Sequence, residues 1–533
     1  MIVLFGTALF LRAYQLGERD FWFDESCTFY YLQNLFDWPD DSRLLVESTN
    51  LPYYVLLRWW MAIFGEREAA LRSMSVIASL AAILFLGLAA RRLAGRQSAL
   101  VTMALASVHP LSIYYAREAR AYALWMLLLA VLLWLLAQAC ITLKKSWWVA
   151  YGAALLFTLH LHYFTVYWVA ASPAFVWIAA NRGRAVRQWL ITHVITAGLF
   201  VPYFFMAVWP AARAGGSAWI GEGGPAWSML ARTLWAFLPA GVYPAHLRGL
   251  SLASGDTHSP WPTWMDQGAA VVPVLVTMLA TWLFWRGQRQ GQEMTDAAAG
   301  RRRSVYVACG GGVMVALLLP IFYSLVVRPT YLVARYDLVA WPAFMVGLGA
   351  LLVDGWRRFS PRTVGRPVLI VVALLCLCSV VADARMLNPP PGASPNQMRA
   401  QRLAKLTGPN DLVVALSYDR WALHYELHRA GFEGRLWSFP SWIDRQVGWV
   451  DTKADLAALA DGRVAQDADR LVEEVSATLR DGGHVWLLAD SLDVKNVGAR
   501  AMIHQEFIAA MTEAGMSAET RVEEFAIFEI GGR

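Results

Sequence analysis

The sequence predicts a polytopic α-helical membrane protein with about eleven transmembrane helices and a small external α/β domain at its C-terminal end. Of the 533 residues, 57% are hydrophobic and only 16% are charged, whereas soluble domains typically carry ~25% charged residues. The 26 Trp residues agree with this class, because Trp and Tyr favour membrane–water interfaces. These proportions exclude a purely cytosolic enzyme, a disordered chain and a fibrous protein.

Charge divides the chain into two parts. Residues 385–533 hold 16 basic and 21 acidic side chains, a net charge of −5, and the remaining 384 residues hold 30 and 19, a net charge of +11. We therefore expect a membrane domain at 1–385 and a soluble domain at 386–533. The positive charge lies between apolar segments, so it does not indicate a nucleic-acid partner. The soluble domain has no Cys, which excludes a disulfide framework there.

Eleven apolar segments are candidates for the ~20-residue helices that cross a bilayer. They lie at 1–13, 73–90, 97–113, 121–142, 147–160, 164–180, 189–208, 266–285, 305–325, 336–353 and 367–383. The first is short and has no basic flank, so we expect either a start further upstream or a truncated helix. A cleaved signal peptide is disfavoured, because no A-x-A-like site precedes Arg12.

The distribution of Lys and Arg predicts the orientation. With Met1 in the cytoplasm, the cytoplasmic loops hold 17 basic side chains in 48 residues, and the opposite side holds 13 in 135. This orientation gives two large external loops, 14–72 and 209–265, and places the C-terminal domain outside.

The C-terminal domain is expected to be α/β. It follows a stiff linker, Asn388–Gly392. Short apolar runs then alternate with helical patterns. The runs are Leu412–Leu416, Val485–Ala489 and Phe525–Ile530, and the helical patterns are Trp421–Arg429, Ala468–Arg480 and Ala501–Ala514. The domain shows neither a G-x-G-x-x-G motif nor a P-loop, so nothing in it indicates nucleotide binding.

Ionisable residues near a membrane are costly and often functional, and here they gather at the external ends of the spans. Asp24 and Glu25 lie among aromatic residues after the first span. Asp24 could accept a proton from a hydroxyl group or hold a cation. It could equally be the N-cap of a helix over 25–35, with Glu25 in the first turn. The two interpretations are compatible, because a cap also fixes the carboxylate.

A second cluster connects the third and fourth spans by a very short turn. It contains His109, Arg117, Glu118, Arg120 and Tyr122. Two guanidinium groups at a lipid boundary suit a phosphate site, because Arg makes bidentate contacts and is always charged. Anchoring to lipid headgroups with an internal ion pair is the alternative.

Two further clusters lie on the same side. The spacing of His160 and His162, which precede Tyr163, is poor for metal ligation on a helix. Arg335 and Tyr336 open the tenth span, where the guanidinium could reach an anionic group or simply snorkel to the interface. Anchors placed at random would populate both sides of the membrane, so four clusters on one side favour a single shared site.

The order of these motifs resembles the polytopic GT-C glycosyltransferases of the bacterial protein-mannosyltransferase and aminoarabinose-transferase kind. The resemblance covers about residues 1–385. It is carried by Arg12–Glu25, Pro52–Leu57, Phe64–Arg72, His109–Tyr122, His160–Tyr163 and Arg335–Tyr336. The chain departs from many relatives at Ser48–Leu51, where those have a His or a Pro-Pro pair.

This resemblance implies transfer of a sugar from a polyprenyl-phosphate donor to a lipid, glycan or protein acceptor at the external face of a bacterial inner membrane. Asp24 would match the acidic residue proposed as general base or acceptor-positioning group, with Glu25 beside it. Arg117, Glu118, Arg120 and Tyr122 would line the donor site, and Arg335 would lie near the lipid phosphate. We expect inversion at the anomeric carbon, because nothing indicates a covalent nucleophile.

Two other functions are compatible with parts of this sequence. A transporter or flippase is disfavoured, because such proteins often show repeated halves and charges at mid-bilayer depth. A non-catalytic assembly protein would explain the acidic C-terminal domain but not the clusters. A divalent cation could be held by Asp24, Glu25 and Glu118, although Arg117, Arg120 and Arg335 could supply the same positive charge.

Overall fold

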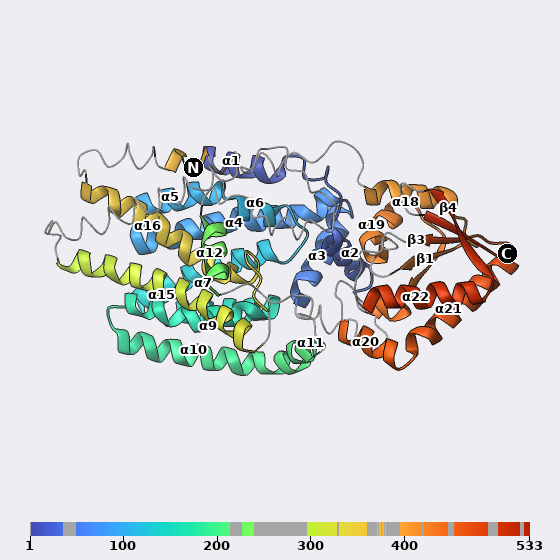
Figure 1. The fold of residues 1–533 in the computed structure, drawn as a ribbon. Coiled ribbons are helices and arrows are strands. Elements are labelled where there is room, and N and C mark those ends of the chain that lie inside the picture. The colour runs from blue at the N-terminus through green and yellow to red at the C-terminus, as the bar shows by residue number, and fades with distance from the viewer. Residues whose placement is uncertain are drawn as a thin grey trace. The chain divides into compact units, whose positions relative to one another are not determined.

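The computed structural model describes residues 2–35, 50–213, 226–238, 296–327, 330–359, 395–416, 419–445, 452–488, 499–522 and 527–532, with single residues and short pieces between 370 and 379. Contacts divide the chain into two compact units (Figure 1). The first comprises Met1–Arg19, Ser48–Pro210 and Ile220–Pro389, and the second comprises Asp20–Glu47, Ala211–Trp219 and Pro390–Arg533.

The described part of the chain before residue 360 is helical. Its helices are α1 (Ile2–Ala13), α2 (Phe23–Gln33), α3 (Leu51–Phe64), α4 (Glu68–Ala94), α5 (Arg96–Ser107), α6 (Pro110–Ala116), α7 (Tyr122–Thr142), α8 (Lys145–Leu161), η3 (Tyr163–Thr165), α9 (Val166–Ala171), η4 (Ser172–Ile178), α10 (Arg182–Tyr203), η5 (Phe204–Val208), α11 (Trp209–Arg213), α12 (Ala226–Phe237), α15 (Asp296–Val326), η7 (Tyr336–Ala340) and α16 (Trp341–Phe359). Of these, α2 and the last residues of α11, from Ala211 on, belong to the second unit.

Within the described residues, five helices are long and apolar enough to cross a bilayer, so the chain is a multi-pass membrane protein. They are Glu68–Ala94, Tyr122–Thr142, Arg182–Ala211, Ser304–Val326 and Tyr336–Asp354. A sixth is counted if α5 and α6, which meet at 58°, form one span. The sequence predicts a single span over 97–113. The chain bends there because Pro110 lacks an amide hydrogen and restricts His109. The predicted spans at 266–285 and over most of 367–383 lie outside the described residues.

Helix α4 packs against α5 and α7 in the first unit. Arg12 connects the end of α1 to α4, α5 and α6 by hydrogen bonds, and its side chain is fully buried. Its guanidinium donates to the Ser79 hydroxyl at 2.8 Å, to the Ser107 carbonyl at 2.7 Å and to the Ser112 hydroxyl at 2.9 Å. These bonds explain why a charged residue can end a short apolar helix here.

The second unit contains a five-stranded sheet in the order β2-β1-β3-β5-β4. Strands β2, β1 and β3 are parallel, and β5 is antiparallel to both β3 and β4. The elements are α18 (Pro395–Leu406), β1 (Leu412–Leu416), α19 (Asp419–Arg429), β2 (Arg435–Phe439), η8 (Ser441–Arg445), α20 (Thr452–Ala460), α21 (Arg463–Arg480), β3 (Val485–Leu488), α22 (Ala499–Glu513), β4 (Met516–Val522) and β5 (Ile527–Gly532). The predicted α/β organisation of this region is confirmed.

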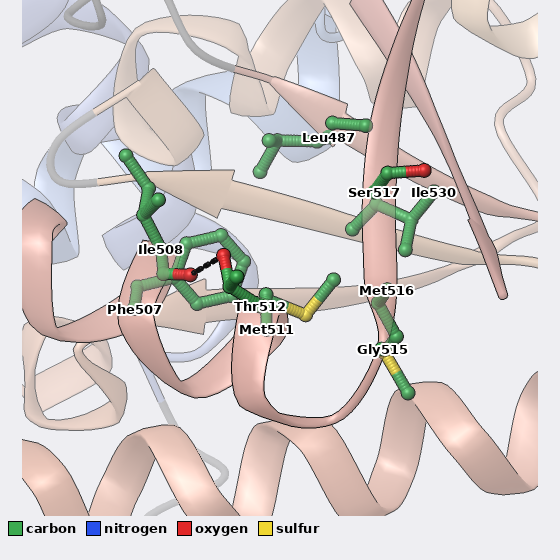
Figure 2. A pocket seen from close by; sticks show the side chains of 10 residues that line it. Leu487, Phe507, Ile508, Met511, Thr512, Gly515, Met516, Ser517 and Ile530 are labelled. Atoms are coloured by element: carbon green, nitrogen blue, oxygen red, sulfur yellow. Dashed lines mark hydrogen bonds between the residues drawn. The ribbon is translucent and has the colours of Figure 1, made fainter. Parts of the chain in front are cut away.

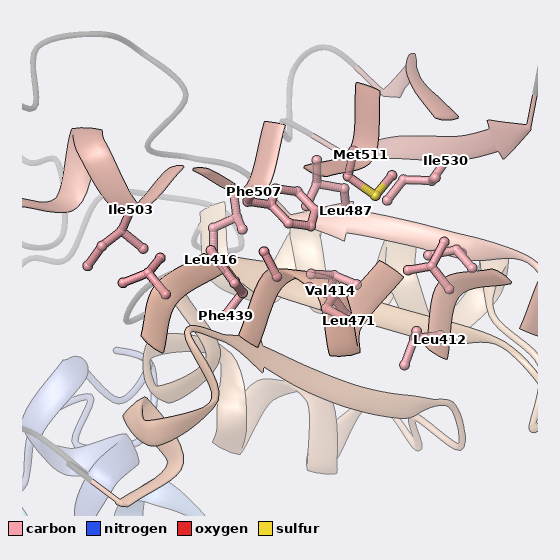
Figure 3. Packing of buried hydrophobic residues seen from close by; sticks show 14 of the residues in the cluster. Leu412, Val414, Leu416, Phe439, Leu471, Leu487, Ile503, Phe507, Met511 and Ile530 are labelled. Carbon is pink, nitrogen blue, oxygen red and sulfur yellow. The ribbon is translucent and has the colours of Figure 1, made fainter. Parts of the chain in front are cut away.

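All five residues of β1 are buried, because helices cover both faces of the sheet. Leu412, Val414 and Leu416 pack with residues of α20, α21 and α22 (Figure 3). Val413 and Ala415 face α18 and α19 on the other side. The alternation follows from the two-residue period of a strand.

A cavity of about 290 Å³ lies beside the first of these cores (Figure 2). Phe507, Met511 and Ile530 line it together with Ile508, which is 48% exposed. Its wall is mostly apolar, and it separates part of α22 from β4 and β5.

Candidate functional site

Three of the four predicted clusters meet in the first unit. Tyr122 begins α7, His162 ends α8, and Arg335 and Tyr336 lead into η7. The ring centroids of Tyr122 and His162 are 6.0 Å apart, and those of His162 and Tyr336 are 6.1 Å apart. The guanidinium carbon of Arg335 lies 5.1 Å from the centroid of the Tyr122 ring. We call the group of Tyr122, His162, Arg335 and Tyr336 the arginine–aromatic cluster.

Arg335 is only 4% exposed, and the backbone before it holds it in place. Ala334 has φ +61°, a left-handed conformation that is uncommon for a residue other than glycine. Its amide donates to Oδ2 of Asp337 at 2.9 Å, and its carbonyl accepts from the Tyr115 hydroxyl. The guanidinium is placed over Tyr122 by this turn, in a cation–π contact.

Asp337 connects three segments. Besides the Ala334 amide, its Oδ2 accepts hydrogen bonds from the Thr233 hydroxyl at 2.6 Å and from the Tyr331 hydroxyl at 3.4 Å. The side chain is fully buried, and within the described residues its Oδ1 has no hydrogen-bond partner. This carboxylate therefore supports the turn that carries Arg335.

His162 is a neutral, buried member of the cluster. Its ring stacks on that of Trp125, with centroids 3.9 Å apart and planes 7° apart. Burial, together with the charges of Arg335 and Arg120, lowers the pKa of His162 to about 3. Its Nδ1 has no hydrogen-bond partner in the part of the chain that the structure describes. The guanidinium groups of Arg335 and Arg120 both act on this ring, and the buried carboxylates of Glu118 and Asp337 act on the neighbouring Tyr115.

The short turn between α6 and α7 separates its two arginines. Nη1 of Arg120 donates to the Tyr54 hydroxyl at 3.4 Å, and its charge acts on His162. Arg117 instead donates to the carbonyls of Tyr14 at 2.5 Å and Gln15 at 3.3 Å. It thus holds the chain after α1. Glu118 is buried, and its carbonyl accepts from the Ser75 hydroxyl at 2.6 Å.

The other histidines point elsewhere. Nδ1 of His160 lies 2.8 Å from the Leu156 carbonyl, and its ring contacts Tyr203 of α10. Nε2 of His109 lies 3.0 Å from the Phe237 carbonyl. Tyr163 is adjacent to the cluster, with its ring centroid 6.0 Å from that of His162.

Asp24 and Glu25 lie in the first turn of α2, which belongs to the second unit. The expectation that Asp24 is an N-cap is wrong, because Trp22 takes that position and the helix starts at Phe23. Glu25 instead contributes to capping the N-terminus of the helix, because its Oε2 accepts a hydrogen bond from the Trp22 amide at 3.4 Å. The chemical role of either carboxylate stays a prediction.

Sequence reasoning missed the residues that support the cluster. Trp125 lies three positions after Tyr122 on α7, a spacing that puts two side chains on one helix face. Phe164 stacks on Tyr336, with ring centroids 4.2 Å apart. Asp337 follows Arg335 by two residues and belongs to the same sequence motif at the start of the tenth predicted span, but the pattern alone assigns it no role.

Comparisons with known proteins agree with the motifs. Residues 51–209 match the family model described as dolichyl-phosphate-mannose-protein mannosyltransferase. The chain shares its fold with the oligosaccharyltransferase AglB of Archaeoglobus fulgidus, solved in complex with an inhibitory peptide and a dolichol-phosphate. The TM-score is 0.51 at 11% identity, covering 100% of this chain and 74% of that one.

ArnT from Cupriavidus metallidurans has also been solved, in the apo state and bound to undecaprenyl phosphate. It gives a TM-score of 0.44 at 14% identity, covering 99% of this chain and 97% of that one. No curated protein sequence matches this chain. The predicted resemblance to GT-C glycosyltransferases is confirmed by the family match and the shared fold.

Proposed function

We propose that this chain is an integral-membrane glycosyltransferase that transfers a sugar from a polyprenyl-phosphate carrier to an acceptor at the external face of a bacterial inner membrane. The single observation that carries the proposal is the buried guanidinium of Arg335, held over Tyr122 and beside the neutral His162. The family match over residues 51–209 supports it.

In the proposed reaction an acceptor oxygen attacks the anomeric carbon of the sugar. A carbon–oxygen bond forms there, and the bond between that carbon and the phosphate oxygen breaks. The polyprenyl phosphate leaves with the electron pair, and the configuration inverts. A carboxylate takes the acceptor proton, and Asp24 is the proposed base, with Glu25 as its neighbour.

Arg335 and Arg120 would stabilise the charge that develops on the departing phosphate. A buried donor that is already in place needs little reorganisation during reaction. His162 would offer a neutral ring nitrogen to the donor, and Tyr122 and Tyr336 would form an aromatic wall. The sugar is a hexose or pentose, and the acceptor is a lipid, a glycan or a protein.

The first test measures transfer directly. Native membrane vesicles containing the full chain, which also retain the acceptor, would be given radiolabelled undecaprenyl-phosphate hexoses and pentoses, and release of undecaprenyl phosphate would be followed. Arg335→Ala should reduce release by at least about 100-fold, the scale on which loss of one preorganised donor acts. Arg335→Lys should recover part of it.

A matched control is available at Arg182, whose guanidinium carbon lies 4.6 Å from the Trp177 ring centroid. Arg182→Ala removes a similar cation–π contact outside the cluster and should leave release unchanged. A flippase would move the labelled lipid between leaflets without breaking the sugar–phosphate bond. That result, or normal release by Arg335→Ala, would refute the proposed function.

A further inference from the structure

Helix α2 presents one face to the C-terminal domain. That face consists of Ser26, Phe29, Tyr30 and Gln33, spaced as i, i+3, i+4 and i+7. Such spacing places side chains on one stripe of a helix. Phe29 and Ser26 are fully buried. The helix lies in the same compact unit as residues 390–533, although more than 300 residues separate it from them in the sequence.

Helix α19 offers a stripe of the same spacing, made of Trp421, His424, Tyr425 and His428. The aromatic rings of the two stripes interlock. Phe29 lies 4.9 Å from Tyr425 in an edge-to-face arrangement, and Tyr30 lies 4.6 Å from Trp421 in the same manner. Aromatic pairs favour such geometry and contribute beyond the area they bury.

Gln33 adds a polar bridge to this contact. Its Oε1 can only accept, so Nε2 of His424 donates to it at 2.9 Å. The amide nitrogen of Gln33 donates to Nδ1 of His428 at 3.4 Å. The Tyr425 amide donates to the Ser26 hydroxyl at 3.2 Å. One amide thus bonds two imidazoles, which sets the rotation and register of α2 on α19.

Asp24 and Glu25 belong to the rigid first turn of the same helix. Any rotation of α2 on α19 therefore moves both carboxylates. We infer that α19 of the C-terminal domain holds α2 through Gln33, His424 and His428, and so acts as the positioning element for the Asp24 and Glu25 carboxylates. The positioning role rests on the proposed function, whereas the contact itself does not. The C-terminal domain would then be part of the catalytic apparatus.

The experiment uses the full chain in lipid nanodiscs with two readouts. Hydrogen–deuterium exchange of the peptide covering 23–33 reports on α2. Release of undecaprenyl phosphate, with an extract of the native membranes supplying the acceptor, reports kcat and the KM of the donor. Gln33→Ala should speed exchange in α2 and lower kcat by at least about tenfold, the effect of losing two side-chain hydrogen bonds, with donor KM changed less than about twofold. Gln33→Glu should restore both values, because a carboxylate can accept from both imidazoles.

His484→Ala is the matched control, since His484 lies in the same domain and contacts Glu529 rather than α2. It should leave both readouts unchanged. Unchanged exchange in Gln33→Ala would refute the contact, and faster exchange with normal kcat would refute positioning. If the unsubstituted protein releases nothing, the proposed function fails, and the positioning role fails with it. The exchange rates then still decide whether α19 holds α2.

Discussion

Arg335 lies against the face of Tyr122, with its guanidinium carbon 5.1 Å from the ring centroid. The two residues lie 213 positions apart in the sequence, and the contact joins the start of α7 to the loop before η7. A buried cation needs such a partner, because leaving it unpaired away from water is costly. The pair is therefore the first target for mutation.

Tyr122→Leu should weaken binding of undecaprenyl phosphate by about fivefold, because a partly desolvated cation–π contact contributes ~0.5–2 kcal/mol. Tyr122→Phe should bind normally, since it keeps the ring face. Titration of the purified protein in detergent with undecaprenyl phosphate measures this difference. Trp177→Leu is the control, because it removes the ring under Arg182. Equal affinity of the Leu and Phe variants at position 122 would contradict the role of the ring.

Asp337→Ala should destabilise the first unit by about 2 kcal/mol or more, because it leaves the buried Thr233 hydroxyl and Ala334 amide without their acceptor, whereas the Tyr331 hydroxyl keeps Thr233 at 2.7 Å. Asp337→Asn keeps one acceptor oxygen and should be milder. Thermal unfolding in detergent, followed by Trp fluorescence, would show the order of the midpoints. If Ala and Asn lower the midpoint equally, the hydrogen bonds of Oδ2 are not what stabilises the turn.

Contact between α2 and α19 should weaken in acid. Burial, together with the charges of Arg420 and His428, lowers the pKa of His424 to about 4. In the unfolded chain the His424 ring takes up a proton near pH 6.5. In the folded chain the same ring takes up a proton only near pH 4. The stabilisation is therefore complete above pH 6.5 and falls as the pH drops towards 4, by at most about 3 kcal/mol.

The measurement is the thermal midpoint of the full chain between pH 4 and 8, compared with that of His424→Gln. The variant does not titrate at this position, so its midpoint should depend less on pH within the window from 4 to 6.5. The two proteins should have parallel profiles above pH 7. Parallel profiles across the whole range would show that His424 does not titrate as expected.

Phe507→Ala should destabilise the C-terminal domain by ~3–5 kcal/mol, the usual cost of removing a buried aromatic ring. Phe507 is 2% exposed and packs in the core on the face of β1 covered by α22. Ile508→Ala on the same helix should cost less than ~0.5 kcal/mol, because that side chain is half exposed. Exchange rates of the β1 and β3 amides would rank the two variants. Equal protection would mean that the cavity absorbs the loss of the ring.

Strands inside the sheet were predictable, and strands at its edges were not. Leu412–Leu416 and Val485–Leu488 are continuous apolar runs because both faces of these strands are covered. Met516–Val522 forms an edge strand with Ser, Glu, Thr and Arg in it. Edge strands tolerate polar residues on their open side, so apolar patterning does not mark them. The other edge strand, Arg435–Phe439, escaped for the same reason.

The site followed a similar division. Motifs at the ends of spans identified Tyr122, His162 and Arg335, which the structure brings together. They also identified His109 and His160, which contact other helices. A motif shows that a polar residue is unusual near the membrane. It does not show which neighbouring side chain or backbone group that residue contacts in the fold.

The sequence by itself determined the helical, multi-pass class of the chain, the acidic α/β domain and the set of polar side chains in the motifs, because each depends on composition or on a local period. Only the tertiary structure decided that Arg335 lies over Tyr122 and that α2 packs on α19. Those contacts join residues hundreds of positions apart. They depend on how the helices pack against one another, and the local pattern of residues along the sequence does not predict that packing.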